Sequence, residues 1–327
     1  MAYLAGRAFL IGPPAAESAA RRLGPPFRLL STFPGILASA AGPRRSTRPD
    51  CVDCRAMSDL QNTPGLLEAM AAAALEAGRV AHEIYLGHFE VQRKADQSPV
   101  TAADHAAEAI ILERLRVAAP GVPVVAEEEV AAGRVPVIGN EFFLVDPLDG
   151  TKEFVQRNGD FTVNIALVRA GDPVLGVVYA PVTAALYLGD VGAGLAQRGY
   201  YGPGASTPSP RDPIRVRQPP AHGLTVVVSR SHSTPETETY LTHYQVAERV
   251  SVGSSLKFCR VAAGEADLYP RLGPTMEWDT AAGQAVLIAA GGTVSAPGGA
   301  PLRYGKTGLR NSFFIAAGLL HTVPLTA

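Results

Sequence analysis

The sequence predicts a layered fold of the α/β or α+β class, in which helices cover sheets. A pair of helical segments comes first, a series of short strands follows, and helices then alternate with strands. In addition, 47% of the 327 residues are hydrophobic, which is enough to fill a substantial core. A net charge of −1 argues against the basic surface that nucleic-acid binding requires. We therefore expect a globular protein with no nucleic-acid partner.

Residues 1–57 differ from the rest of the chain in composition. They hold eight Arg and no Lys against three acidic residues, and they show no sustained hydrophobic period. Organellar transit peptides share this Arg-rich, acid-poor composition. However, Met57 lies directly before the folded pattern. We therefore favour a disordered or spurious N-terminal extension over a targeting segment.

The folded domain is expected over residues 58–327. It divides into an N-terminal α+β part, about 58–200, and a C-terminal α/β part, about 214–327. The segment between them, 202–213, is rich in Gly, Pro and Ser, as linkers are.

The cysteines and the hydropathy indicate in which cellular compartment the protein resides. Cys51 and Cys54 have no further metal ligands nearby, and Cys259 lies in an apolar stretch with helical spacing, where we expect a core residue. No apolar run reaches the roughly 18–20 residues that a membrane span needs. These features predict a cytoplasmic protein without a disulfide framework, and they leave peripheral association with the inner membrane open.

The first two helices are predicted at 64–86 and 101–118. Asn62 and Pro64 supply a cap and a first-turn proline for the first helix, and Pro120 ends the second. Strands and helices follow in chain order. The expected strands are 122–126, 142–145, a meander over 160–198 with turns near Gly171, Pro181 and Gly192, then 224–231 and 244–252; the expected later helices are 254–263 and 280–290.

The segment "DPLDG" follows the apolar strand 142–145. Pro147 forces Asp146 into an extended conformation, and Gly150 allows a sharp turn, so Asp146 and Asp149 can face one site. Two carboxylates at such a short distance repel each other unless a cation lies between them. Magnesium accepts carboxylates as ligands. A solvated turn is the competing interpretation, because Asp, Pro and Gly are common turn residues.

Three further acidic residues stand at the ends of predicted elements. Glu127 follows the strand 122–126, Asp279 opens a helix, and Asp104 lies in the first turn of another. Each has a simpler interpretation: a solvated acidic run for Glu127, an N-cap for Asp279, and a favourable first-turn charge for Asp104. Their joint occurrence at element ends favours a shared site, because sheet-based active sites collect their ligands there.

The segment "DGTKEF" predicts a helix start that can bind phosphate. If a helix begins at Thr151 or Lys152, its free N–H groups can bind a phosphate. Thr151 can hold a hydroxyl toward a water that Asp104 activates as a general base. Together with the carboxylates, this pattern predicts metal-assisted hydrolysis of a phosphomonoester.

These motifs resemble the inositol monophosphatase superfamily of lithium-sensitive, magnesium-dependent phosphatases. The residues that carry the resemblance are Asp146 to Thr151, "TAAD" ending at Asp104, Glu127, and Trp278-Asp279 with "TAAG". Within the superfamily, "NGDFTVNIALV", "GSSLKFCRVAAGEADLYPR" and "GPTMEWDTAAGQAVL" are similar to the CysQ-type 3'(2'),5'-bisphosphate nucleotidases. The similarity covers about Leu60 to Leu320.

The resemblance implies an α/β layered sandwich shared with fructose-1,6-bisphosphatases, two or three Mg²⁺ ions, and a small-molecule substrate. CysQ members remove the 3'-phosphate of 3'-phosphoadenosine 5'-phosphate, giving AMP, and so clear a by-product of sulfate assimilation. A homodimer is left open. The resemblance implies these metal ligands: Glu127, Asp146, the carbonyl of Leu148, Asp149 and Asp279. It implies that Gly150 and Thr151 contact the phosphate and that Asp104 and Thr151 activate the water. The mobile loop that helps to bind a third metal in the superfamily would include Lys94, Asp96 and Thr101.

One departure separates the subfamilies. Inositol-specific members have a glutamate where this chain has Arg271, in "YPR". A guanidinium suits a second phosphate better than a ring of hydroxyls. We therefore expect Arg271 and Lys257 to contact the substrate, at the 5'-phosphate or adenine of a nucleotide, although a surface Arg near a turn is the simpler interpretation.

Two other functions compete with this one. The first is a phosphatase of inositol phosphate, histidinol phosphate or a sugar bisphosphate within the same superfamily. The second is a calcium-binding module, but an EF-hand loop needs Gly at its sixth position and Glu at its twelfth, where this chain has Thr151 and Arg157. The choice among 3'-phosphoadenosine 5'-phosphate, its 2'-isomer and the 5'-phosphosulfate stays open.

Overall fold

The structure is a computed structural model that describes residues 63–94, 99–202, 210–230 and 234–325. These residues fall within one compact unit, Asp50–Ala327. The predictions for residues 1–57, including Cys51 and Cys54, lie outside the described residues, as does Asp96. Cys259 is fully buried, as predicted.

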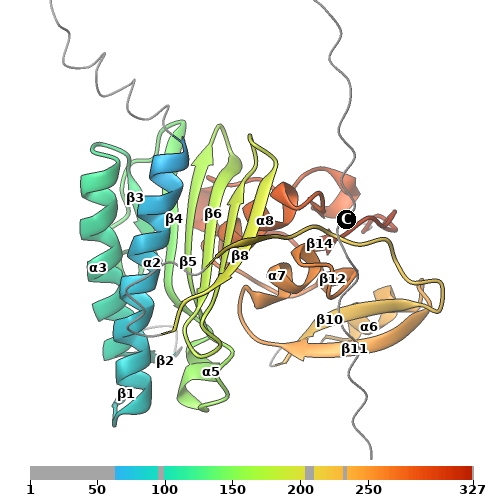
Figure 1. The fold of residues 1–327 in the computed structure, drawn as a ribbon, viewed down its shortest axis with the longest axis horizontal. Helices are drawn as coiled ribbons and strands as arrows, with labels where there is room; N and C mark the ends of the chain where they lie inside the picture. The colour runs from blue at the N-terminus through green and yellow to red at the C-terminus, as the bar shows by residue number, and fades with distance from the viewer. Residues whose placement is uncertain (1–62, 95–98, 203–209, 231–233, 326–327) are drawn as a thin grey trace, which may run out of the picture. The chain divides into compact units, whose positions relative to one another are not determined.

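A seven-stranded sheet forms the larger half of the fold (Figure 1). Its strands pair in the order β3-β4-β5-β6-β7-β8-β9, and all pairs are antiparallel except β3 with β4. The predicted meander is therefore confirmed. The strands are β3 (Val124–Ala126), β4 (Glu141–Asp149), β5 (Thr162–Arg169), β6 (Asp172–Ala180), β7 (Ala185–Asp190), β8 (Leu195–Tyr200) and β9 (Asp212–Pro213).

The two predicted N-terminal helices cover one face of this sheet. They are α2 (Thr63–Leu86) and α3 (Ala102–Ala118), and their buried side chains form one apolar cluster with β4, β5, β6 and β7. Thr101 caps α3, because its hydroxyl accepts a hydrogen bond from the N–H of Ala103. Ahead of α3 lies a short hairpin of β1 (Val91–Arg93) and β2 (Pro99–Thr101).

A five-stranded sheet forms the second half, in the order β11-β10-β12-β14-β13. Helices α7 and α8 lie between the two sheets, and α6 packs on the far face of the smaller one, so the layers alternate helix, sheet, helix, sheet, helix. The elements are β10 (Leu224–Ser229), α6 (Pro235–Leu241), β11 (Val246–Val252), α7 (Leu256–Ala262), β12 (Leu268–Arg271), α8 (Ala281–Ala289), β13 (Thr293–Ser295), β14 (Phe314–Ala317) and two 3-10 turns, η1 (Pro297–Gly299) and η2 (Thr307–Leu309).

Helix α8 approaches the larger sheet closely because two strand positions carry no side chain. A Cβ atom on Gly176 of β6 would lie 2.4 Å from the carbonyl oxygen of Ala282. A Cβ atom on Gly189 of β7 would lie 2.6 Å from the Cα atom of Val286. The helix backbone therefore rests directly on the sheet, and the loop that leads into α8 is fixed relative to β6 and β7.

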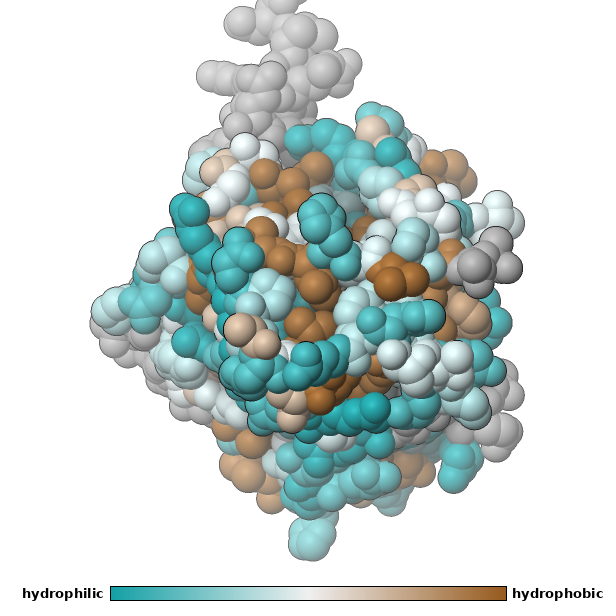
Figure 2. Space-filling model, turned by 90° about the vertical axis from the view of Figure 1, so that its right-hand side faces the viewer, coloured by the Kyte–Doolittle hydropathy of each residue, from teal (hydrophilic) through white to brown (hydrophobic). Residues whose placement is uncertain are grey.

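The surface shown in Figure 2 carries apolar residues in small groups between polar ones. None of the helices within the described ranges is long and apolar enough to cross a membrane.

Candidate active site

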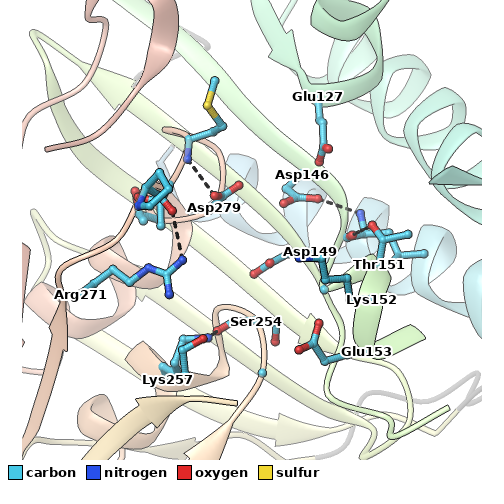
Figure 3. Close-up of a pocket in the computed structure, with 18 of the residues that line it drawn as sticks. Glu127, Asp146, Asp149, Thr151, Lys152, Glu153, Ser254, Lys257, Arg271 and Asp279 are labelled. Atoms are coloured by element: carbon cyan, nitrogen blue, oxygen red, sulfur yellow. Dashed lines mark hydrogen bonds between the residues drawn. The ribbon is translucent and has the colours of Figure 1, made fainter. Parts of the chain in front are cut away.

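A pocket of about 410 Å³ opens where the two halves of the fold meet. One wall comes from the end of β4 and from α5 (Thr151–Val155), and the other comes from α7, β12 and the loop that precedes α8. Figure 3 shows carboxylates and cations from these elements pointing into the same space. The lining includes most of the predicted site residues: Glu127, Asp146, Leu148, Asp149, Gly150, Thr151, Lys257, Arg271 and Asp279.

A β-bulge in β4 places two aspartates on the pocket side. Asp146 pairs with Asn164 of β5 and Asp149 pairs with Thr162, so two residues of β4 lie opposite one residue of β5. Residues three apart in a regular strand would point to opposite faces, and the extra residue restores a common face. The prediction that this strand ends at Val145 was therefore wrong, because β4 continues to Asp149 through the bulge.

Glu127 reaches the pocket from the first residue of α4 (Glu127–Ala131). Its carboxylate accepts a hydrogen bond of 2.6 Å from the ammonium of Lys94, which also lies 2.5 Å from Glu128. Glu128 is buried, and the interpretation of this run as solvated was wrong for it. Lys94, which the resemblance placed in a mobile loop, contacts both glutamates in this structure.

Asp279 lies before α8 but does not cap it. The residue at the N-cap position is Thr280, which makes no side-chain capping bond. The Asp279 carboxylate accepts a 2.8 Å hydrogen bond from the N–H of Met276 instead. The N-cap interpretation was therefore wrong, and the side chain points into the pocket (Figure 3).

The electrostatics of these carboxylates fit a divalent cation. Burial raises the pKa of Asp146 and of Asp279 well above the usual range, and the neighbouring carboxylates raise it further. Burial also raises the pKa of Glu127 and Asp149, against the pull of Lys94 and Lys257. A divalent cation in the shared space would favour the charged forms of these carboxylates.

The carboxylates do not close into a finished cage. Among the residues described, no three His, Cys, Asp or Glu side chains already stand in a coordinating arrangement. Magnesium usually keeps several waters and takes only one or two carboxylates together with substrate phosphate oxygens. An open cluster of oxygen donors suits that ion better than it suits zinc or a caged calcium.

Gly150 lets the chain turn from β4 into α5. Its φ is +94°, and a Cβ atom there would lie 3.0 Å from the carbonyl oxygen of Asp160. The next residue, Thr151, begins the helix as predicted, and its hydroxyl lies 3.3 Å from Oδ1 of Asp104.

Asp104 has two roles. Its Oδ2 accepts hydrogen bonds from the N–H and the hydroxyl of Thr101, which completes a capping box. Its Oδ1 faces Thr151, and burial raises the pKa of the carboxyl. The first-turn interpretation is thus correct, and the same side chain also reaches the site.

Arg271 and Lys257 line the other side of the pocket, and both are buried (Figure 3). One guanidinium nitrogen of Arg271 donates to the carbonyl of Pro274, whereas Nε and Nη1 are buried with no hydrogen-bond partner among the described residues. Burial lowers the pKa of Lys257 to about 8, although Asp149 pulls it upward. Arg271 is therefore not the surface residue that the simpler interpretation expected.

Sequence reasoning missed several residues of the site. Ser254, Glu153 and Arg310 line the pocket, and Asn164 and Ser255 hydrogen-bond its carboxylate Asp149. The run "GSSLK" and the Asn of "TVNIALV" were noted only as parts of longer motifs. Ser255 lies 106 residues from Asp149 in the chain, so its role depends on tertiary contacts.

Comparison with known proteins identifies the family. A model of the inositol monophosphatase family matches residues 63–323. The chain therefore belongs to the inositol monophosphatase family. It is 48% identical over 231 residues to the 3'(2'),5'-bisphosphate nucleotidase CysQ of Salmonella typhimurium, covering 70% of this chain and 89% of that protein. It is 47% identical over 241 residues to the CysQ of Escherichia coli strain K12, covering 73% and 94%.

Solved structures agree in fold. CysQ from Bacteroides thetaiotaomicron matches with a TM-score of 0.65 and 41% identity, over 78% of this chain and 98% of that one. Inositol monophosphatase from Anabaena matches with a TM-score of 0.60 and 29% identity, over 79% and 91%. The predicted layered fold is confirmed.

Proposed function

We propose that the protein is a 3'(2'),5'-bisphosphate nucleotidase that converts 3'-phosphoadenosine 5'-phosphate to AMP and phosphate. The observation that carries this proposal is the guanidinium of Arg271, which is buried beside a carboxylate cluster with two nitrogens that find no partner in the part of the chain that the structure describes. A buried donor without a partner costs free energy, and a second phosphate on the substrate would satisfy it. The relatives named CysQ support the same activity.

The carboxylates would hold magnesium, on which the family generally depends. Glu127, Asp146 and Asp149 would form one site with the carbonyl of Leu148, and Asp279 would complete a second; a third ion would bind more weakly than these two. Bound magnesium supplies charge neutralisation at the phosphoryl oxygens and acidifies water.

Asp104 and Thr151 would activate the attacking water. The Thr151 hydroxyl can donate to Oδ1 of Asp104 while its lone pair accepts a hydrogen bond from water. Because the pKa of Asp104 is raised, this carboxylate is a better base than an exposed aspartate. As the water oxygen bonds to phosphorus, the bond from phosphorus to the ribose 3' oxygen breaks.

Gly150 and Thr151 would contact the reacting phosphate, because N–H groups in the first turn of a helix have no partner within it. Lys257 and Arg271 would then bind the second phosphate on the opposite wall. The pKa of Lys257, about 8 in the protein alone, would rise when a phosphate lies beside it.

The test is phosphate release by the full chain with magnesium, from 3'-phosphoadenosine 5'-phosphate and from inositol 1-phosphate in parallel. We expect kcat/KM to favour the nucleotide by about a hundredfold, or about 2.7 kcal/mol. A preference for inositol 1-phosphate would overturn the substrate and leave the metal site in place. Millimolar lithium is expected to inhibit turnover, as is typical of the family.

A further inference from the structure

Ser255 lies between two of the carboxylates without lining the pocket itself. It is only 1% exposed and directly precedes α7. Its N–H donates to Oδ2 of Asp149 at 2.6 Å, and its hydroxyl donates to the backbone carbonyl of Asp279 at 2.8 Å. One residue thus contacts a carboxylate from β4 and the loop that carries the carboxylate before α8.

Asn164 of β5, in the larger sheet, hydrogen-bonds both Asp149 and Ser255. Its amide nitrogen donates to Oδ2 of Asp149 at 3.2 Å and to the Ser255 hydroxyl oxygen at 2.9 Å. An amide nitrogen has two protons and a hydroxyl has one, so each donor in this set has its own acceptor. Asn164 is fully buried, and its amide oxygen has no hydrogen-bond partner among the described residues, so the two hydrogen bonds that its amide nitrogen donates hold the side chain in place.

We infer that Ser255 is a positioning residue that sets the Asp149 and Asp279 carboxylates relative to each other; this inference rests on the proposed function. Asp149 belongs to β4 of the larger sheet, whereas Asp279 belongs to the loop that precedes α8. Without the Ser255 hydroxyl, the loop that carries Asp279 would lose this direct link to Asn164 and Asp149. The Asn164 amide, which the Ser255 hydroxyl holds in place, hydrogen-bonds the proposed ligand Asp149 directly, and removal of such groups typically costs about 10- to 100-fold in metal affinity.

The test measures Mg²⁺ binding by the full chain without substrate, using isothermal titration calorimetry. We expect Ser255→Ala to raise the dissociation constant for Mg²⁺ about tenfold. Asn164→Ala should give a shift in the same direction, and the double variant should show less than the sum of the two free-energy changes, because both disturb one network. Asn164→Ala also keeps the inference testable if Ser255→Ala does not fold.

A matched control is Thr237→Val in α6. Thr237 is also a buried residue whose hydroxyl lies within hydrogen-bond distance of another hydroxyl, that of Thr234. Its loss should lower the melting temperature without changing Mg²⁺ affinity. If Ser255→Ala and Asn164→Ala also lower only the melting temperature, the inference is wrong while the proposed function stands. If the unmodified protein binds no Mg²⁺, the proposed metal site fails first.

Discussion

At the residue scale, Asp279 combines one hydrogen bond with a strongly unfavourable charge environment. Asn at this position can still accept the hydrogen bond from Met276, but it removes a negative charge from the cluster. We expect Asp279→Asn to lower turnover by more than about 100-fold, because on our proposal it removes a metal ligand. The melting temperature of the metal-free protein should stay the same or rise. A large fall in melting temperature with turnover retained would indicate a structural role instead.

Arg271 determines, on our proposal, which substrate enters. Arg271→Glu should raise KM for 3'-phosphoadenosine 5'-phosphate by about 10- to 100-fold, because charge-assisted hydrogen bonds are worth about 1.5–3 kcal/mol. The KM for inositol 1-phosphate should change far less. Arg310→Glu is the matched control, since it makes the same charge change at an exposed position of the same pocket. Equal effects of Arg271→Glu on both substrates would contradict the assignment.

Single residues also show how far sequence reasoning reaches. Asp146, Asp149 and Gly150 were predictable because a strand, a turn and a helix start are local patterns. Asn164 and Ser255 were not, because an Asn inside a strand and a Ser before a helix acquire their roles only through contacts with distant residues.

At the scale of elements, the close contact of α8 with the larger sheet should limit substitution. Gly189→Ala places a methyl group 2.6 Å from the Cα atom of Val286, and overpacking of this kind costs about 1–3 kcal/mol. Chemical denaturation should show a loss of that size. Gly139→Ala is the control, because nothing lies within 4 Å of its Cβ position. A neutral Gly189→Ala would mean that α8 can move away from the sheet.

The helices and strands themselves were largely predictable, whereas the bulge in β4 was not. Helical spacing and caps marked α2, α3, α7 and α8. The Pro in "DPLDG" indicates the end of a strand by its missing N–H, but a bulge allows the strand to continue to Asp149. Only the pairing with β5 shows that the strand continues through the bulge and does not end at the proline.

At the scale of the whole molecule, the carboxylate cluster should make stability depend on pH and metal. The pKa of Asp146 and of Asp279 is raised in the folded state, so the folded protein keeps protons that the unfolded chain has released. The free energy of unfolding of the metal-free protein should therefore fall as pH rises from about 4 toward neutrality.

Mg²⁺ should reverse this loss, because on our proposal it binds the charged carboxylates of the folded state. Differential scanning calorimetry with EDTA or with Mg²⁺ is expected to show a rise in melting temperature that is larger at pH 8 than at pH 5.5. Asp279→Asn should reduce the difference. A Mg²⁺ effect that is independent of pH would contradict this account.

A layered fold was predictable from the succession of elements, but the joining of the two halves was not. One apolar cluster includes Phe142 and Val178 of the larger sheet together with Phe258 of α7 and Phe314 of β14. Such contacts between distant segments leave no local pattern in the sequence. The division near 200–214, the homodimer and the cytoplasmic location stay predictions.

The two walls of the pocket belong to different halves of the chain, and this has an evolutionary consequence. Asp146, Asp149 and Thr151 come from the larger sheet and the helix after it, whereas Lys257 and Arg271 come from α7 and β12. On our proposal, mutations in α7 and β12 can therefore change which molecule is accepted while the proposed catalytic groups, Asp279 before α8 included, stay untouched. A family built this way can diversify its substrates without reinventing its chemistry.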